Sequence, residues 1–250
     1  MSILTQSHAW LALRAHRQSM AGASLAQLFV DEQRFEHLSL RLGELLLDYS
    51  KNLVDSDTIK LLAALARERG VGDEMLRLFS GEKVNTSENR PALHTALRGG
   101  QPVMVDGADV MPQIQATLER MREFSDGVRA GSVSGHGGKP FTDIVNIGIG
   151  GSHLGPALAT RALAPYASPS LRVHFVSNLD IAALQRTLAP LNAATTLAII
   201  ASKTFTTVET LANARSVRDW ISQSVGGGAH KHLVAVTANT QLALDFGISQ

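Results

Sequence analysis

The chain has 250 residues, a formal net charge of +1 and no cysteine. Its 44% hydrophobic and 18% charged residues allow a large buried core and exclude a disordered protein, while the near-neutral charge and 5% aromatic content disfavour a nucleic-acid partner. The absence of cysteine excludes disulfides and thiolate catalysis. No apolar stretch reaches the ~18 residues of a membrane helix, and Arg14, His16 and Arg17 interrupt any signal segment. We therefore predict a cytoplasmic protein without a membrane partner.

Residues 1–135 are predicted to form a mostly helical segment with a small β-hairpin. Alternating apolar and polar residues indicate the first strand, and Gly43-Glu44 offers a tight turn to the second. Helix starts are indicated by capping residues and by a proline in the first turn. In chain order, the predicted elements are strands at 37–42 and 45–49, a helix between Asp55 and Gly70, and a helix that begins at Pro112.

Residues 136–250 are predicted to form an α/β domain. Glycine and serine in the segment 131–140 indicate either the boundary between two domains or a surface loop within one. Short apolar runs rich in β-branched residues then alternate with segments long enough for crossover helices. These runs are Ile144 to Ile149, Val173 to Val176, Leu197 to Ala201 and Leu233 to Val236. Their nearly continuous apolar character predicts a doubly wound, mainly parallel sheet inside a three-layer αβα sandwich.

A glycine-rich loop follows the first of these strands. In Gly148-Ile149-Gly150-Gly151-Ser152 the glycines would let the backbone approach a ligand, and Ser152 adds a hydroxyl at a helix start. A dinucleotide fingerprint would need glycine where His153 stands, and a P-loop would need a lysine. Asp180, after the second strand, is placed where a nicotinamide enzyme holds its ribose, but we expect it to form a turn or a helix cap.

The segment Ser202-Lys203-Thr204-Phe205-Thr206-Thr207 follows the third strand and precedes a predicted helix. Its hydroxyls and ammonium group suit a phosphate at the carboxyl end of a parallel sheet, where the helix start adds N–H groups and a positive dipole end. The alternative is that the hydroxyls cap the helix and Lys203 is a solvated surface charge. Together with the Gly151-Ser152 loop, this segment predicts one anion site, in which each charge-assisted hydrogen bond contributes about 1.5–3 kcal/mol.

Several short motifs, in order and spacing over nearly the whole chain, resemble the N-terminal part of the glucose-6-phosphate isomerase (phosphoglucose isomerase) family. Each motif is weak alone, and together they are specific. They are Asp48-Tyr49-Ser50-Lys51-Asn52, Gly81-Glu82-Lys83-Val84-Asn85, Leu93-His94-Thr95-Ala96-Leu97-Arg98, Asn146 to Ser152 with Leu154-Gly155-Pro156, Val176-Ser177-Asn178, and Ile200 to Thr207 with Glu209-Thr210.

The resemblance implies a sugar isomerase (SIS) domain and the interconversion of glucose 6-phosphate and fructose 6-phosphate. It implies that the substrate phosphate binds Ser202, Lys203, Thr204 and Thr207, and that Gly151 and Ser152 line the sugar side. It also implies that no cofactor or metal is needed and that the full-length protein is a homodimer. His153 is a departure, because the family usually has an acidic residue at this position.

The family's catalytic Glu, His, Lys and Arg lie in C-terminal motifs that are not found in these 250 residues. We therefore assign no catalytic residue and expect the chain to be a substrate-binding portion of the enzyme that is inactive alone. The alternative is a non-catalytic sugar-phosphate sensor with the same domain. The extension of the motifs through the helical N-terminal half favours the isomerase.

Overall fold

The computed structural model describes residues 4–249, and the chain divides into two compact units, residues 1–115 and 116–250. The division falls within α7 (Met111–Ala130). The other elements of the first unit, here called unit 1, are η1 (Leu4–Gln6), α1 (His8–Ser19), α2 (Leu25–Leu28), α3 (Arg34–His37), β1 (Ser39–Leu42), β2 (Leu45–Asp48), α4 (Ser56–Glu68), α5 (Val71–Phe79), η2 (Leu93–Thr95), α6 (Ala96–Gly99), β3 (Met104–Val105) and β4 (Ala108–Asp109). The predicted domain boundary between residues 135 and 136 stays a prediction.

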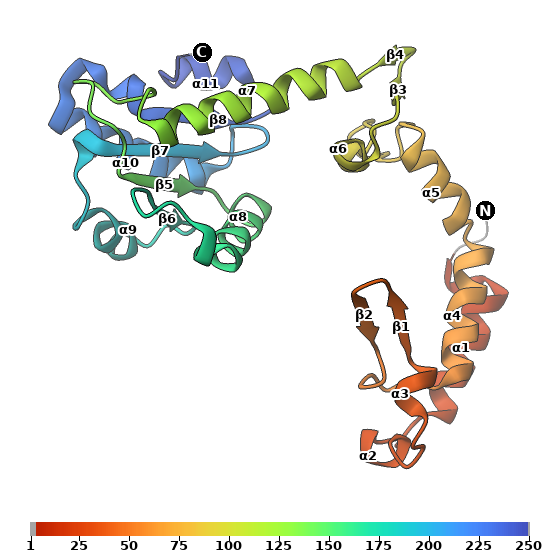
Figure 1. Ribbon diagram of the computed structural model, residues 1–250. Helices are drawn as coiled ribbons and strands as arrows, with labels where there is room; N and C mark the ends of the chain where they lie inside the picture. The colour runs from red at the N-terminus through yellow and green to blue at the C-terminus, as the bar shows by residue number, and fades with distance from the viewer. Residues whose placement is uncertain (1–3, 250) are drawn as a thin grey trace. The chain divides into compact units, whose positions relative to one another are not determined.

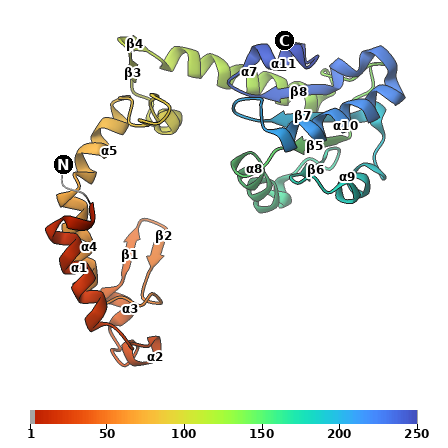
Figure 2. The ribbon, with the colours of Figure 1, turned by 180° about the vertical axis from the view of Figure 1, so that it is seen from behind.

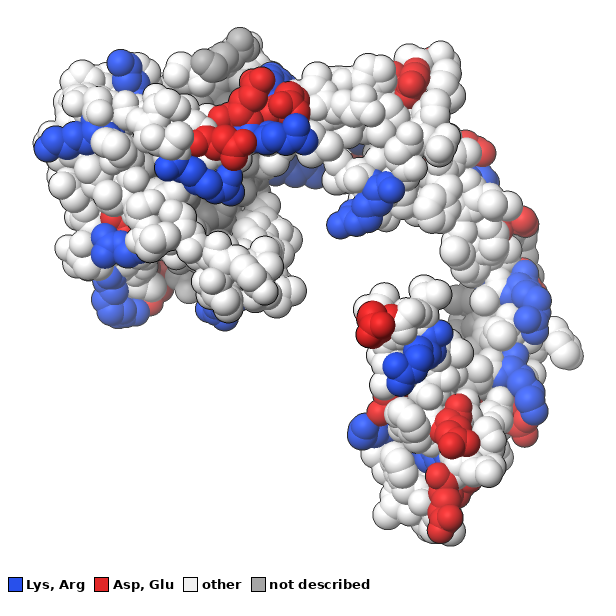
Figure 3. All heavy atoms as spheres, in the orientation of Figure 1, with Lys and Arg blue, Asp and Glu red and all other residues white. Residues whose placement is uncertain are grey.

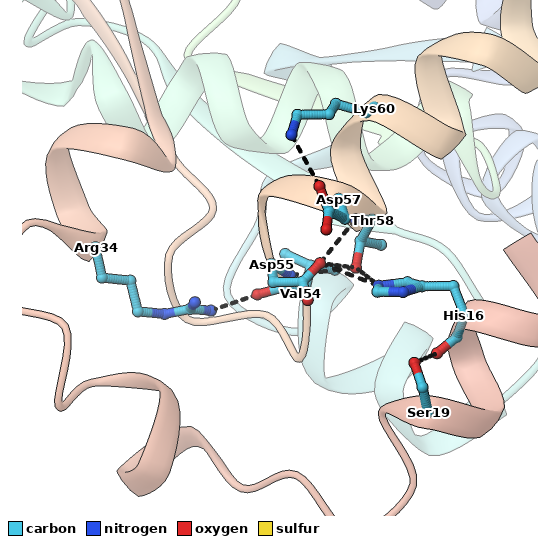
Figure 4. A network of polar contacts seen from close by, with 8 residues as sticks. All are labelled: His16, Ser19, Arg34, Val54, Asp55, Asp57, Thr58 and Lys60. Carbon is cyan, nitrogen blue, oxygen red and sulfur yellow. Dashed lines mark hydrogen bonds and ion pairs between the residues drawn. The ribbon is translucent and has the colours of Figure 1, made fainter.

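The predicted hairpin and helices of unit 1 are present (Figure 1). Strands β1 and β2 pair antiparallel around Gly43, which has a positive φ of 55°. Asp55 caps α4 by accepting hydrogen bonds from the backbone N–H and the hydroxyl of Thr58, and His16 of α1 contacts both side chains (Figure 4). The predicted stop at Gly70 (φ 67°) is also the start of α5, so the chain turns there and continues as helix.

A second small hairpin, β3–β4, is missing from the prediction. Each strand has only two residues, too few for an alternating pattern to be visible. Its turn nevertheless carries a sequence signal, because Asp106 and Gly107 both have positive φ, at 49° and 83°. Asp-Gly is a favoured pair for such a two-residue turn.

The second unit, here called unit 2, is built on a four-stranded sheet. Its remaining elements are β5 (Asp143–Ile147), α8 (Gly151–Ala162), η3 (Ala164–Tyr166), β6 (Arg172–Val176), α9 (Ile181–Leu188), η4 (Ala193–Thr195), β7 (Thr196–Ala201), α10 (Val208–Val225), η5 (Gly226–His232), β8 (Leu233–Val236) and α11 (Thr240–Asp245). All three strand pairs are parallel, and the strand order is β6-β5-β7-β8. The four strands that the apolar runs predicted are therefore present within one or two residues at each end.

Helices lie on both sides of this sheet (Figures 1 and 2). Alternate residues of the two central strands point to opposite faces. On one face, residues such as Val145 and Ile200 join a core with α9 and α10. On the other, Leu197 packs with Val128 of α7. The expected three-layer αβα arrangement with a doubly wound parallel sheet is confirmed.

A buried histidine anchors the loop between α7 and β5 to the sheet. The Nε2 of His232 accepts a hydrogen bond from the backbone N–H of His136 at 2.8 Å, so the Nδ1 carries the proton and donates it to the carbonyl of Thr196 at 2.9 Å. Position 135 requires glycine, because a Cβ there would overlap the His232 ring. The Phe141 ring packs edge to face on the same imidazole. The segment 131–140, which lacks regular structure as expected, is thus fixed to the sheet through His232.

A second polar cluster joins the amino ends of β5 and β6. The buried carboxylate of Asp143 accepts hydrogen bonds from Arg172 at 2.8 Å, from His174 at 2.9 Å and from the hydroxyl of Thr142 at 2.9 Å. Burial alone would raise the pKa of Asp143, but these three donors hold it below its usual value. Because the cluster lies at the amino edge of the sheet, it stabilises strand pairing away from the predicted ligand site.

The charged side chains and the lengths of the helices also bear on possible partners. Figure 3 shows basic and acidic side chains on both units, and a group of acidic side chains lies directly beside basic ones over α7. Among residues 4–249, no helix combines the length and the apolar character needed to cross a membrane.

We predict that the stability of the chain falls at acidic pH partly because of His232. Burial lowers the pKa of this imidazole, whereas the pKa of a histidine side chain in the unfolded chain is about 6.5. The unfolded state therefore binds the proton more readily, so the contribution is complete above about pH 6.5 and is lost as the pH falls towards the folded-state pKa. Melting temperatures at pH 7.5 and 5.5 should differ less in His232→Gln than in the unchanged chain. Equal differences would contradict the assignment.

Candidate phosphate-binding site

The sheet order places two neighbouring strand ends at a topological switch point. The chain leaves β5 towards β6 on one side and later returns to β7 on the other side of β5. In open α/β sheets, ligands bind where the connections diverge in this way, beyond the carboxyl ends of the strands. Ile147 of β5 pairs with Ile200 of β7, so the Gly148–Ser152 and Ser202–Thr207 loops leave the sheet side by side.

The loop after β5 is held close to the sheet by one glycine and one amide. A Cβ at Gly148 would lie 2.8 Å from the Cβ and carbonyl oxygen of Ser152 and 3.1 Å from the carbonyl oxygen of Ala201. The buried side-chain amide of Asn146 donates to the carbonyl of Ser152 at 3.1 Å. Gly148 thus lets both loops approach the same point, and Asn146 fixes where α8 begins. Gly148 belongs to the predicted glycine-rich loop and Asn146 to one of the family motifs, but neither was among the predicted site residues.

The two sugar-side candidates lie in the first turn of α8. Gly151 begins the helix and is exposed, with no atom within 4 Å of a Cβ built on it. Ser152 is half-buried. Gly150, in the N-cap position, has φ 60° and ψ −121°, a conformation that favours glycine. It provides no side chain to cap α8, and the backbone N–H groups of Ser152, His153 and Leu154 donate to the carbonyls of Ile149 and Gly150.

The loop after β7 gathers its hydroxyl groups in two pairs. The Oγ of Ser202 and the Oγ1 of Thr207 lie 3.2 Å apart, and the Oγ1 atoms of Thr204 and Thr206 lie 2.6 Å apart. Ser202 is buried at the strand end and Thr207 is half-buried, whereas Thr204 is exposed. The four hydroxyls therefore line the loop from its base to its rim. Thr206, which the prediction left out, belongs to the set by its contact with Thr204.

The backbone of the loop is fixed by residues that do not carry the predicted chemistry. The carbonyl of Lys203 accepts hydrogen bonds from the N–H of Ala238 at 2.9 Å and from the hydroxyl of Thr237 at 3.2 Å. Phe205 has a positive φ of 57° and a buried ring that meets Phe246 edge to face. The exposed Lys203 side chain thus extends from a backbone that is held on one side by the loop after β8.

The start of α10 provides the electrostatic part of the site. Thr207 is its N-cap residue, but its side chain makes no capping hydrogen bond to the helix and instead contacts Ser202. The alternative that this hydroxyl simply caps the helix is therefore wrong for Thr207. An α-helix of 18 residues carries a partial positive charge of about +0.5 at its N-terminus, which attracts an anion.

Two other residues singled out in the sequence, Asp180 and His153, contribute to the fold. Asp180 caps α9 by accepting from the N–H of Ala182 at 2.9 Å, as expected for a helix cap. His153 of α8 packs edge to face on Phe175, with ring centroids 5.6 Å apart. Among residues 4–249, no three His, Asp or Glu side chains are arranged to hold a metal ion.

Taken together, these features define a doubly wound α/β protein with a candidate phosphate site at its switch point. The family model described as phosphoglucose isomerase matches residues 48–250. A curated glucose-6-phosphate isomerase from Methylococcus capsulatus is 47% identical over 249 residues, which are 98% of this chain and 46% of that protein. The chain belongs to the phosphoglucose isomerase family, as its motifs predict.

A solved structure agrees with this assignment. The crystal structure of a glucose-6-phosphate isomerase from Chlamydia trachomatis D/UW-3/Cx superposes with a TM-score of 0.75 at 28% identity. The match covers 95% of this chain and 46% of that one. The chain thus spans somewhat less than half the length of these relatives, which contain a comparably large region outside the match.

We predict that Gly148→Ala destabilises the chain and weakens anion binding. The added methyl group must displace Ser152 or the end of β7, at a cost of about 1–3 kcal/mol. Gly227→Ala is the matched control, because nothing lies within 4 Å of its Cβ position, and its effect should stay within about 0.5 kcal/mol. Urea unfolding measures both variants. Equal stability of the two variants would show that the close approach at Gly148 is not required.

Proposed function

We propose that this chain supplies the substrate-phosphate-binding part of a glucose-6-phosphate isomerase, which interconverts glucose 6-phosphate and fructose 6-phosphate. The observation that carries the proposal is the side-by-side departure of the Gly148–Ser152 and Ser202–Thr207 loops from β5 and β7. One loop offers small residues, and the other offers hydroxyls, an ammonium group and a helix start. A phosphorylated sugar has the matching parts, a dianionic head and a polar ring.

Each predicted site residue then has a distinct role. The hydroxyls of Ser202, Thr204 and Thr207 donate to phosphate oxygens, and Lys203 adds a charge-assisted hydrogen bond. The first turn of α10 adds N–H donors and its dipole. Gly151 and Ser152 line the sugar side, where the absence of a bulky side chain at Gly151 leaves room for the ring.

The proton transfer itself requires groups that we do not assign to these residues. Moving a proton between adjacent sugar carbons needs a positioned base and groups that stabilise the enediolate. Glu209 lies in the first turn of α10, where a carboxylate is favoured by the helix dipole, and we give it no catalytic role. We propose that the base belongs to the region found in the relatives outside the match.

The wider context follows from the same proposal. Residues 136–250 would form a SIS-type domain, and the whole enzyme would be a cytoplasmic homodimer of glycolysis and gluconeogenesis that needs no cofactor or metal. Nucleic acid and membranes are not expected among its partners.

We predict that fructose 6-phosphate raises the melting temperature of the chain and that fructose does not. A ligand at 100 times its dissociation constant stabilises the folded state by about 2.7 kcal/mol, which is several degrees for a chain of this size. Lys203→Ala should remove most of the shift. Lys231→Ala removes an exposed lysine next to the amino end of β8, away from the site, and should leave the shift unchanged. Equal shifts with both sugars would refute the phosphate site.

We also predict that the 250-residue chain has no isomerase turnover above background while it retains sugar-phosphate binding. The reason is the assignment of the base to residues outside the chain. A coupled assay with fructose 6-phosphate measures turnover, with a full-length relative as the positive control. Turnover similar to that of the full-length enzyme would place the base within residues 1–250.

A further inference from the structure

Unit 1 presents a hairpin with an entirely aliphatic outer face. In the β1–β2 register, Leu40 pairs with Leu47 and Leu42 pairs with Leu45. Residues 40 and 42 point to the same side of their strand, and directly paired residues share a face. The four side chains therefore form one surface, here called the leucine face, and they are 61%, 78%, 72% and 60% exposed for residues 40, 42, 45 and 47.

Hydrogen bonds of two charged side chains hold the chain at the base of the hairpin. The buried guanidinium of Arg34 donates to the carbonyls of Ser50, Asn52 and Val54 at 2.8 to 2.9 Å, and its contact with Val54 is drawn in Figure 4. Asp48 accepts from the backbone and hydroxyl of Ser50 and from Lys51, and these donors lower its pKa to about 2.

The leucine face is therefore held in a fixed direction. A loose flap would not need a buried arginine to organise the chain at its base. Among residues 4–115, moreover, β1 and β2 pack extensively only on each other. A two-stranded hairpin is marginally stable in water by itself, and both of its strands are edge strands.

We propose that the leucine face is a permanent intramolecular interface, covered in the full-length enzyme by an apolar surface of the region that the relatives have outside the match. That region makes up more than half of each relative, since this chain accounts for only 46% of their length. The four contacting side chains are aliphatic, without the charge or the aromatic and arginine anchors of transient interfaces. Such a composition is typical of a domain core that is divided between two segments.

The test compares the 250-residue chain with a chimera in which it is continued by the unmatched region of the Methylococcus capsulatus relative. Hydrogen exchange of residues 39–48 should slow by about 10-fold or more in the chimera. Leu42→Lys/Leu45→Lys should lower the melting temperature of the chimera by more than about 4 °C and leave that of the 250-residue chain unchanged. Leu46→Lys is the matched control, because Leu46 pairs with Arg41 on the opposite face, and it should change neither.

Three results would overturn the proposal. Equal exchange in the two proteins would mean that the added region does not cover the hairpin. A dimer of the 250-residue chain that dissociates in the double variant, measured by sedimentation, would make a second copy the occupant. Destabilisation of the monomeric 250-residue chain by the double variant would mean that the chain covers the face itself. The last two measurements need only the 250-residue chain, so they can overturn the proposal even where the chimera does not fold.

Discussion

The parallel pairing of β5 with β7 is the constraint on which the candidate site depends. Because β6 lies on the far side of β5, the connections after β5 and β7 diverge at their carboxyl ends, which is the position where open α/β sheets bind ligands. Two loops that are about 50 residues apart in the sequence thereby face the same space. Neither loop would form a phosphate site alone. The Gly148–Ser152 loop has little charge, and the Ser202–Thr207 loop by itself would contact a ligand from one side only.

The turn between β7 and α10 combines backbone strain with close packing of its side chains. Phe205 holds a left-handed backbone conformation, which costs a non-glycine residue about 1–3 kcal/mol. Burial of its ring against Phe246 stabilises the fold by a similar amount, about 1.5–3 kcal/mol. Arg218 in turn lies over the Phe246 ring and donates to its carbonyl. The contacts of Phe205 with Phe246, and of Phe246 with Arg218, thus fix the turn between β7 and α10.

Much of this arrangement could be predicted from the sequence, and the exceptions have physical reasons. The strands of the sheet were predicted because buried parallel strands are continuous apolar runs. The roles of Asn146 and Gly148 were not predicted, because their contacts with Ser152 and Ala201 depend on which strands are neighbours. The β3–β4 hairpin was too short to show a period. The buried position of His232 was also hidden, since its partners His136 and Thr196 are distant in sequence.

The chain belongs to the phosphoglucose isomerase family and spans less than half the length of the relatives that it matches. The most direct test is a crystal structure of the chain with fructose 6-phosphate. We expect the phosphate within hydrogen-bond distance of the Ser202, Thr204 and Thr207 hydroxyls, with the sugar beside Gly151. A phosphate bound elsewhere, with the Ser202–Thr207 loop unoccupied, would contradict it.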